Sequence, residues 1–177
     1  MDALKKTLGL FVIIFIWPCS NLLWGQDKLY GALEYQMPFK EALLVLKENK
    51  RSYQNISFGS GTSYTIRRAS LKRKNNRLYS LILNSKKNLN LKQASSYLKT
   101  THSFFEKEGF KVVYADNHWT DPLLRDPKKP CIRMVNAEKN LLIEMEPIGQ
   151  GAIYNIYVTF YNYKWFVSKI TGKKTSL

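Results

Sequence analysis

The sequence predicts an α+β fold, in which two helices pack on one or two antiparallel sheets in the order helix, strands, helix, strands. Three observations support this prediction. Apolar residues recur at helical spacing in two segments, after Pro38 and after Asn90. Segments with the alternation of a strand follow each of them, and the clearest is residues 153–163. Turn sequences between neighbouring strand segments favour antiparallel pairing.

The first helical segment begins after Pro38 and extends to about Lys50. Proline is common at a helix start because its missing N–H would have no partner there. The apolar residues of this segment recur at the spacing of one helix face: Phe39, Ala42, Leu43 and Leu46. We therefore expect this face to be buried on a sheet. Residues 55–63, which follow, are rich in Ser, Gly and Asn and predict a loop.

Residues 64–83 have the pattern of a β-hairpin. The pair Asn75-Asn76 tolerates the positive φ angles that tight hairpin turns require. The alternate residues that share one face of the second arm are Tyr79, Leu81 and Leu83. In the first arm the alternation of apolar residues breaks at Arg67-Arg68, which predicts a β-bulge there.

The second helix has the strongest local signals in the chain. Asn90 can cap its first turn, and Gln93, three residues later, completes a capping box. The residues expected on its buried face are Leu91, Ala94, Leu98, Thr101 and Phe105. Gly109 can adopt the left-handed conformation that ends a helix, and Phe110 can then fold back on the last turn.

Strands are predicted for most of the remaining chain. Residues 110–115 form an apolar segment, and residues 132–137 are expected to pair with residues 141–145 across a short turn. In residues 153–163 apolar side chains alternate with more polar ones, so one face belongs to the core and the other is tyrosine-rich.

A weak internal similarity links residues 66–75 to residues 132–140. Each range contains an Ile-Arg pair followed by a Lys-Asn pair, although the spacing differs by one residue. The similarity suggests a duplicated helix-plus-hairpin unit. The sequence contains no nucleophile-elbow, phosphate-loop, dinucleotide-binding or zinc-ligand pattern. These absences favour a protein that is not an enzyme and that holds no cofactor or metal.

The first 25 residues have the pattern of a secretory signal peptide. A short start with two lysines precedes an apolar run over residues 8–17, and Gly25 is a small residue before the predicted cleavage point. A helix of ten residues is about 15 Å long, half the thickness of a bilayer core. We therefore expect an exported protein, periplasmic or extracellular, with a single α+β domain over residues 26–177. The alternative is an uncleaved membrane anchor.

The chain is strongly basic, with 28 Lys and Arg residues against 13 Asp and Glu residues and a net charge of +15. No acidic residue occurs between Asn49 and Phe105. The basic residues are densest in one short stretch: Arg67, Arg68, Lys72, Arg73, Lys74 and Arg77. This pattern predicts an anion-binding surface, and a solvated basic surface is the alternative.

Export narrows the class of anion. It disfavours nucleic acid and favours lipid head groups, lipopolysaccharide or cell-wall polymers. We therefore expect a non-enzymatic envelope or secreted module that contacts an anionic surface through residues 67–77.

The alternative function, a small exported hydrolase, would use the long connection formed by residues 116–130. Its candidate residues are Asp116, His118, Asp121 and, directly after the connection, Cys131. His118 and the acids could ligate a metal or act as a base, and Cys131 could be a nucleophile. A metal site needs three or four converging ligands, and no sequence feature lowers the pKa of the thiol. We favour a surface loop and a buried Cys131.

Glu144 and Glu146 lie two residues apart in a predicted strand, so both side chains belong to the same face of the sheet. Paired carboxylates can supply the acid and base of a hydrolytic reaction. Two acidic residues on a solvated strand face explain the pattern equally well. Both interpretations stay open on the sequence alone.

Overall fold

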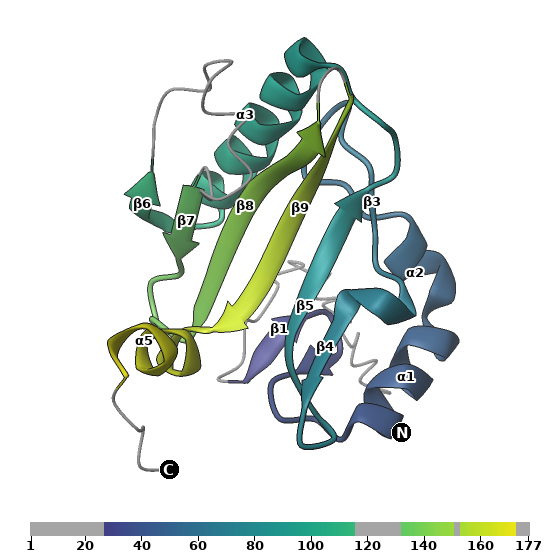
Figure 1. Ribbon diagram of the computed structural model, residues 1–177, viewed down its shortest axis with the longest axis vertical. Coiled ribbons are helices and arrows are strands. Elements are labelled where there is room, and N and C mark those ends of the chain that lie inside the picture. The colour runs from purple at the N-terminus through teal and green to yellow at the C-terminus, as the bar shows by residue number, and fades with distance from the viewer. Residues whose placement is uncertain (1–26, 116–131, 151–152, 173–177) are drawn as a thin grey trace, which may run out of the picture.

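The computed structural model describes residues 27–115, 132–150 and 153–172, which form an α+β fold (Figure 1). Within these ranges seven strands form one antiparallel sheet in the order β3-β5-β9-β8-β7-β6, with β4 also paired to β5, while β1 and β2 form a separate hairpin. The bounds are β1 (Lys28–Tyr30), β2 (Leu33–Glu34), α1 (Phe39–Glu48), α2 (Lys50–Gln54), β3 (Tyr64–Thr65), the 3₁₀ helix η1 (Arg68–Ser70), β4 (Leu71–Lys74), β5 (Arg77–Ser85), α3 (Leu91–Lys107), β6 (Lys111–Ala115), β7 (Ile132–Val135), β8 (Leu141–Gln150), β9 (Ile153–Asn162) and α5 (Tyr163–Thr171).

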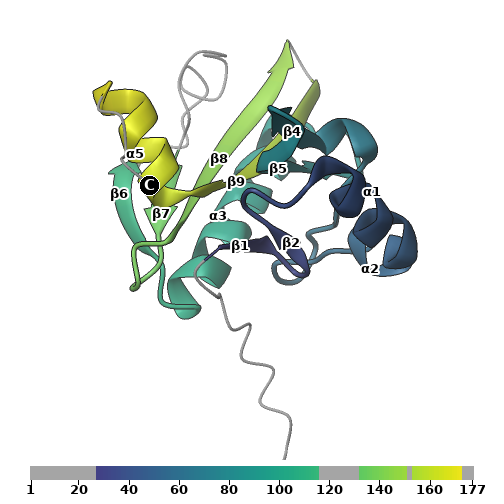
Figure 2. The same cartoon turned by 90° about the horizontal axis from the view of Figure 1, so that it is seen from below.

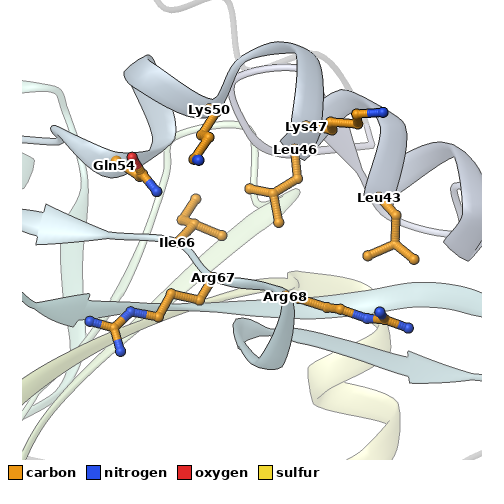
Figure 3. A pocket seen from close by; sticks show the side chains of 8 residues that line it. All are labelled: Leu43, Leu46, Lys47, Lys50, Gln54, Ile66, Arg67 and Arg68. Carbon is orange, nitrogen blue, oxygen red and sulfur yellow. The ribbon is translucent and has the colours of Figure 1, made fainter.

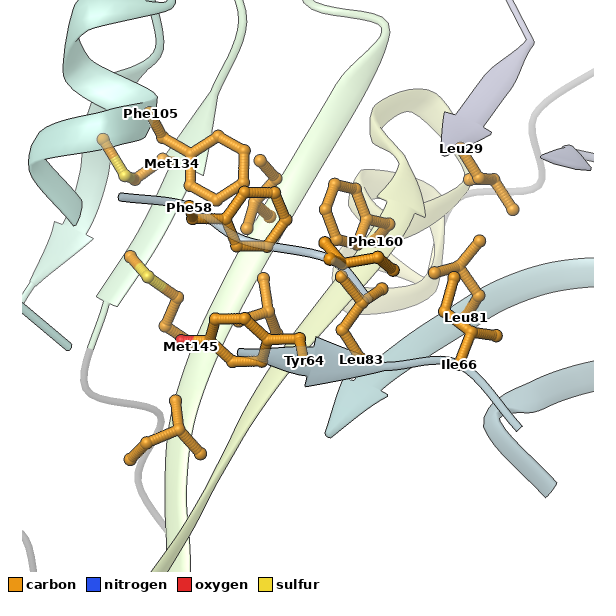
Figure 4. Packing of buried hydrophobic residues seen from close by; sticks show 14 of the residues in the cluster. Leu29, Phe58, Tyr64, Ile66, Leu81, Leu83, Phe105, Met134, Met145 and Phe160 are labelled. Carbon is orange, nitrogen blue, oxygen red and sulfur yellow. The ribbon is translucent and has the colours of Figure 1, made fainter. Parts of the chain in front are cut away.

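The two faces of the sheet have different coverings. Figure 2 shows α3 and the β1–β2 hairpin on one side of the sheet and α5 on the other, with α1 and α2 beyond β4 and β5. Alternate residues of β9, among them Ile156, Val158 and Phe160, are fully buried on the α3 side. Phe58 and Phe105 pack there with ring centroids 4.8 Å apart (Figure 4). The main core therefore lies between the sheet and α3, because that face has the apolar half of the strand alternation.

The first predicted helix, expected to extend to about Lys50, is confirmed as α1, which ends at Glu48, and the short helix α2 that follows was not predicted. Of the predicted apolar face only Ala42 is fully buried, while Leu43 and Leu46 are half-buried. The two helices lie at the side of the sheet, so their apolar residues are only partly covered (Figure 1). Tyr53 of α2 is buried, and its hydroxyl accepts a hydrogen bond from the Ala32 N–H at 3.0 Å.

The predicted hairpin is confirmed as β4 and β5, and Asn75 and Asn76 at its turn have φ angles of 49° and 57°. The predicted bulge at Arg67-Arg68 is wrong, because the 3₁₀ helix η1 separates β3 from β4 there. The irregularity of the ladder lies farther along, where β5 has the extra residue Tyr79. Leu78, rather than Tyr79, therefore shares the buried face with the leucines that follow.

The second predicted helix is confirmed as α3. The Asn90 Oδ1 accepts from the Gln93 N–H and the Gln93 Oε1 accepts from the Asn90 N–H, both at 2.9 Å. Gly109 has a φ angle of 87°, and the Phe110 N–H donates to the Phe105 carbonyl at 2.9 Å. These contacts satisfy backbone groups at both ends of the helix, which explains why the sequence signals were sufficient.

The strand pairings after α3 are confirmed, and β8 and β9 form a ladder along ten residues of each strand. The predicted order of elements lacks the β1–β2 hairpin and α5, and the duplicated unit is not confirmed. Helix α5 begins where the Asn162 Oδ1 accepts from the Trp165 N–H at 3.0 Å. None of the helices in the described ranges has the length and apolar character needed to cross a membrane.

Candidate functional site

A groove lies between the α1–α2 pair and the segment that connects β3 to η1 (Figure 3). Its volume is about 410 Å³, within the range of small-molecule sites. We call it the basic groove, and its lining residues are Leu43, Leu46, Lys47, Lys50, Gln54, Ile66, Arg67 and Arg68. No acidic residue is among them, so the lining combines aliphatic and cationic side chains.

Backbone contacts fix the two walls of the basic groove relative to each other. The Ile66 N–H donates to the Tyr53 carbonyl at 2.8 Å, which ties the β3–η1 segment to α2. The Ser70 hydroxyl oxygen accepts from the Arg67 N–H and from the Asn84 side-chain amide, both at 3.0 Å. The wall that contains the two arginines is therefore held to the helix on one side and to β5 on the other.

The four cationic side chains of the basic groove are exposed: Lys47, Lys50, Arg67 and Arg68. None of their charged groups forms an ion pair or hydrogen bond with another residue of the described part of the chain. Figure 3 shows the ammonium group of Lys50 directed toward Ile66, while Arg67 and Arg68 extend in opposite directions along the groove. Within the described part of the chain, these charges are therefore available to contact an anion.

Of the six predicted anion-binding residues, only Arg67 and Arg68 line the basic groove. The remaining four lie on β4 and β5 and mostly have contacts of their own: the Arg73 guanidinium lies over the Phe39 ring, Arg77 Nη1 donates to the Gln36 carbonyl at 2.8 Å, Lys72 Nζ donates to the Ala69 carbonyl at 3.3 Å, and Lys74 has no such contact with a described residue. Lys72 and Arg73 have different contacts because neighbouring side chains of a strand point to opposite faces.

The sequence reasoning did not include Lys47 and Lys50 in the binding surface. They are three residues apart beside Leu46, so they lie on one side of the α1–α2 pair next to an apolar residue. That spacing could have indicated from the sequence that the two lysines lie together beside an apolar residue. Their proximity to Arg67 depends on the path of the loop between α2 and β3, which no local pattern encodes.

A second group of charges lies on the face of the sheet that α5 covers (Figure 2). We call Arg133, Glu144 and Glu146 the carboxylate cluster. Glu144 is only 6% exposed, and its Oε2 accepts a hydrogen bond from the Arg133 Nε at 2.5 Å. The solvated-face interpretation of this pair is therefore wrong for Glu144. Burial raises the pKa of Glu146 to about 7, with a further increase from the charge and hydrogen bond of Glu144 and a smaller opposing effect of Arg133.

Aromatic rings surround the arginine of the carboxylate cluster. The Arg133 guanidinium lies 5.1 Å from the Tyr114 ring centroid and 5.2 Å from that of Phe166. Tyr161 stacks on Trp165, so β9 and α5 are held together beside the cluster. Burial, with the Glu144 and Glu146 charges, raises the pKa of Tyr161. The cluster thus consists of paired, partly dehydrated charges that join β7, β8 and α5.

The residues of the alternative hydrolase lie outside the described ranges: Asp116, His118, Asp121 and Cys131. The signal peptide predicted for residues 1–25 lies outside them as well. Within the described ranges no group of three or more His, Cys, Asp and Glu side chains could hold a metal ion. No protein-family model, curated protein or solved structure matches the chain.

Proposed function

We propose that this protein is an exported, non-enzymatic binding module that contacts anionic components of the cell envelope through the basic groove. The observation that supports the proposal is that four exposed cationic residues, none of them ion-paired with another described residue, line one groove that has no acidic residue. Lipid head groups, lipopolysaccharide and cell-wall polymers all present the anions that such a surface attracts. The net charge of +15 adds long-range attraction to these partners.

The exposed cations of the basic groove do not need an acidic partner within the protein and can bind an anion from outside it. An exposed Lys or Arg loses little by staying unpaired, because water solvates it well. Each such residue near an anionic membrane contributes about 1 kcal/mol to binding. Four cations on one groove are therefore sufficient for measurable adsorption, and the binding should weaken with salt because the attraction is screened.

Vesicle sedimentation tests the proposal. The purified protein should pellet with phosphatidylglycerol-containing vesicles and not with neutral phosphatidylcholine vesicles. Changing Lys47, Lys50, Arg67 and Arg68 together to glutamine should weaken the binding by at least about tenfold. Raising the ionic strength from about 0.1 M to about 1 M should also abolish it, since the screening length falls from about 10 Å to about 3 Å.

A matched control separates the groove from the net charge. Changing Lys92, Lys99, Lys107 and Lys111 to glutamine also removes four positive charges, but from exposed positions on α3 and β6 outside the groove. This control variant should retain most of the binding. Equal losses in the two variants would show that the total charge, and not the basic groove, determines adsorption, and the proposal would then be wrong.

The proposed location has its own test. The native protein, purified from cell fractions, should begin at or near Gln26 and should occur in the periplasmic or external fraction, because residues 1–25 have the pattern of a cleaved signal. N-terminal sequencing gives the answer directly. An intact N-terminus in the membrane fraction would support the anchored alternative instead.

A further inference from the structure

The basic groove has an aliphatic floor that adsorption to a charged surface does not require. Leu43 and Leu46 of α1 point into it from one wall, and Ile66 lies at its base (Figure 3). Both leucines belong to the face that helical periodicity predicts to be buried, yet they are only half-buried. Partly uncovered apolar side chains beside cations that have no ionic partner among the described residues fit a ligand with both an apolar and an anionic part.

We infer that the basic groove binds one anionic phospholipid, with its phosphate on the cationic side chains and the first methylene groups of an acyl chain on Leu43, Leu46 and Ile66. This inference rests on the proposed function and narrows it from an anionic surface to a single lipid molecule. The occupant follows from complementarity of charge and polarity, since the lining contains four cations, three aliphatic residues and one amide, and no acid.

Phosphate fits the cationic part better than a carboxylate does. The donors come from both walls, with Lys50 above Ile66 and Arg67 and Arg68 on the opposite side (Figure 3). A phosphate oxygen array accepts hydrogen bonds in several directions, and a guanidinium group can donate two parallel hydrogen bonds to it. The oxygens of a phosphodiester are arranged tetrahedrally, whereas the two oxygens of a carboxylate lie in one plane, so the phosphate better suits donors placed on two sides.

Three aliphatic side chains are enough for the beginning of one acyl chain and not for a whole lipid tail. The rest of the lipid would stay in the bilayer, so the protein would lie on the membrane surface with the groove facing it. This geometry predicts that affinity increases with chain length only over the first few carbons. Beyond that length the added methylene groups no longer contact the protein.

The test uses soluble alkyl phosphates below their micelle concentration, with binding followed by calorimetry or NMR titration. Inorganic phosphate should bind most weakly, and ethyl, butyl and hexyl phosphate should bind progressively more tightly, by about fivefold for each added pair of partly buried methylene groups. Octyl phosphate should bind about as tightly as hexyl phosphate. Hexanol, which has the chain without the charge, should not bind measurably.

Substitutions in α1 test where the alkyl chain of the ligand binds. Leu46→Ser should remove most of the dependence on chain length and leave the binding of ethyl phosphate unchanged. Leu44→Ser is the matched control, because Leu44 is 56% exposed on the same helix and does not line the groove, and this variant should bind all the probes normally. Leu43→Ser gives a second readout should Leu46→Ser not fold, as judged by circular dichroism.

The outcomes separate this inference from the proposed function. Affinity that increases with chain length and loses this dependence in Leu46→Ser or Leu43→Ser supports the single-lipid site. Affinity that is independent of chain length, together with vesicle binding that still requires the groove cations, overturns the inference and leaves the proposed function intact. Absence of binding to anionic vesicles overturns both.

Discussion

The basic groove and the carboxylate cluster both contain charged side chains, but those of the groove are exposed and those of the cluster are paired and partly buried. In the groove, exposed cations have no ionic partner in the described part of the chain and lie beside aliphatic side chains. In the cluster, Arg133 is paired with the nearly buried Glu144 and lies between two aromatic rings. A charge without an internal partner is available to a ligand, whereas a paired and dehydrated charge is part of the structure.

This difference has an energetic consequence. Removing one member of a buried ion pair leaves the other without compensation in a poorly solvated site, and the free energy of unfolding falls sharply. Removing an exposed cation changes the free energy of unfolding little, because water solvates that cation in the folded state. Substitutions in the carboxylate cluster should therefore lower stability, and substitutions in the basic groove should weaken ligand binding without lowering stability. Three measurements test that separation, and we describe them from the largest expected effect to the smallest.

Arg133→Met should destabilise the protein by about 3 kcal/mol, because Glu144 would stay buried without its partner. The side chain of Arg133 is 26% exposed, which places the effect at the lower end of the range for buried pairs. Urea denaturation measures it. Arg67→Met, in the groove, is the matched control and should change the free energy of unfolding by less than about 0.5 kcal/mol. Similar losses in both variants would contradict the comparison.

The pH dependence of stability gives the next largest effect. The folded-state pKa of Glu146 is raised from 4.5 to about 7, so between these values the folded protein binds more protons than the unfolded chain. Stability should therefore fall as pH rises from about 4.5 to about 7 and then level off. We expect a loss of about 1 kcal/mol, reduced from the full linkage value because Glu146 is only partly buried.

Glu146→Gln imitates the protonated acid and should remove this pH dependence. Melting temperatures at several pH values between 5 and 8 compare the variant with the native protein. Glu138→Gln is a suitable control, because Glu138 is an exposed acid in the turn between β7 and β8. A native protein that is equally stable across this range would show that the carboxylate cluster does not share a proton.

The smallest effect on stability is expected in the basic groove. Arg68→Gln should change the free energy of unfolding by less than about 0.5 kcal/mol, since its charged group has no partner in the described residues. The same variant should bind anionic vesicles measurably more weakly. Chemical denaturation and vesicle sedimentation on one preparation give both values. Destabilisation without a change in binding would reverse the assignment of the two regions.

Local signals predicted the elements whose stabilising contacts are local. The capping residues of α3 and the Asn75-Asn76 turn act within a few residues of themselves, so the sequence was sufficient to place them. Helix α5 was missed because Tyr163 and Trp165 continue the aromatic pattern of the preceding strand. Asn162 as a cap and Gly172, with a φ angle of 67°, were signals that could have indicated it.

The sites depended on contacts that local patterns do not contain. Alternation assigned Glu144 correctly to the face opposite the core, but its burial depends on Arg133, which comes from another strand. The basic groove requires that Lys50 and Arg67 meet across a loop. Charge density alone selected residues 67–77 as one surface, although only Arg67 and Arg68 line the basic groove and Arg73 lies over Phe39 of α1.

The central strand of the sheet also determines the order in which the molecule can assemble. β9 pairs along its whole length with β8, its neighbour in sequence, and on its other side with β5, which precedes it by α3 and the strands β6 to β8. A hairpin closes within microseconds, whereas pairing across a long separation must first overcome the entropy of closing a large loop. We expect β8 and β9 to pair first and β5 to join them later. The half of the chain that contains the basic groove therefore completes its sheet only after the last strand has been made.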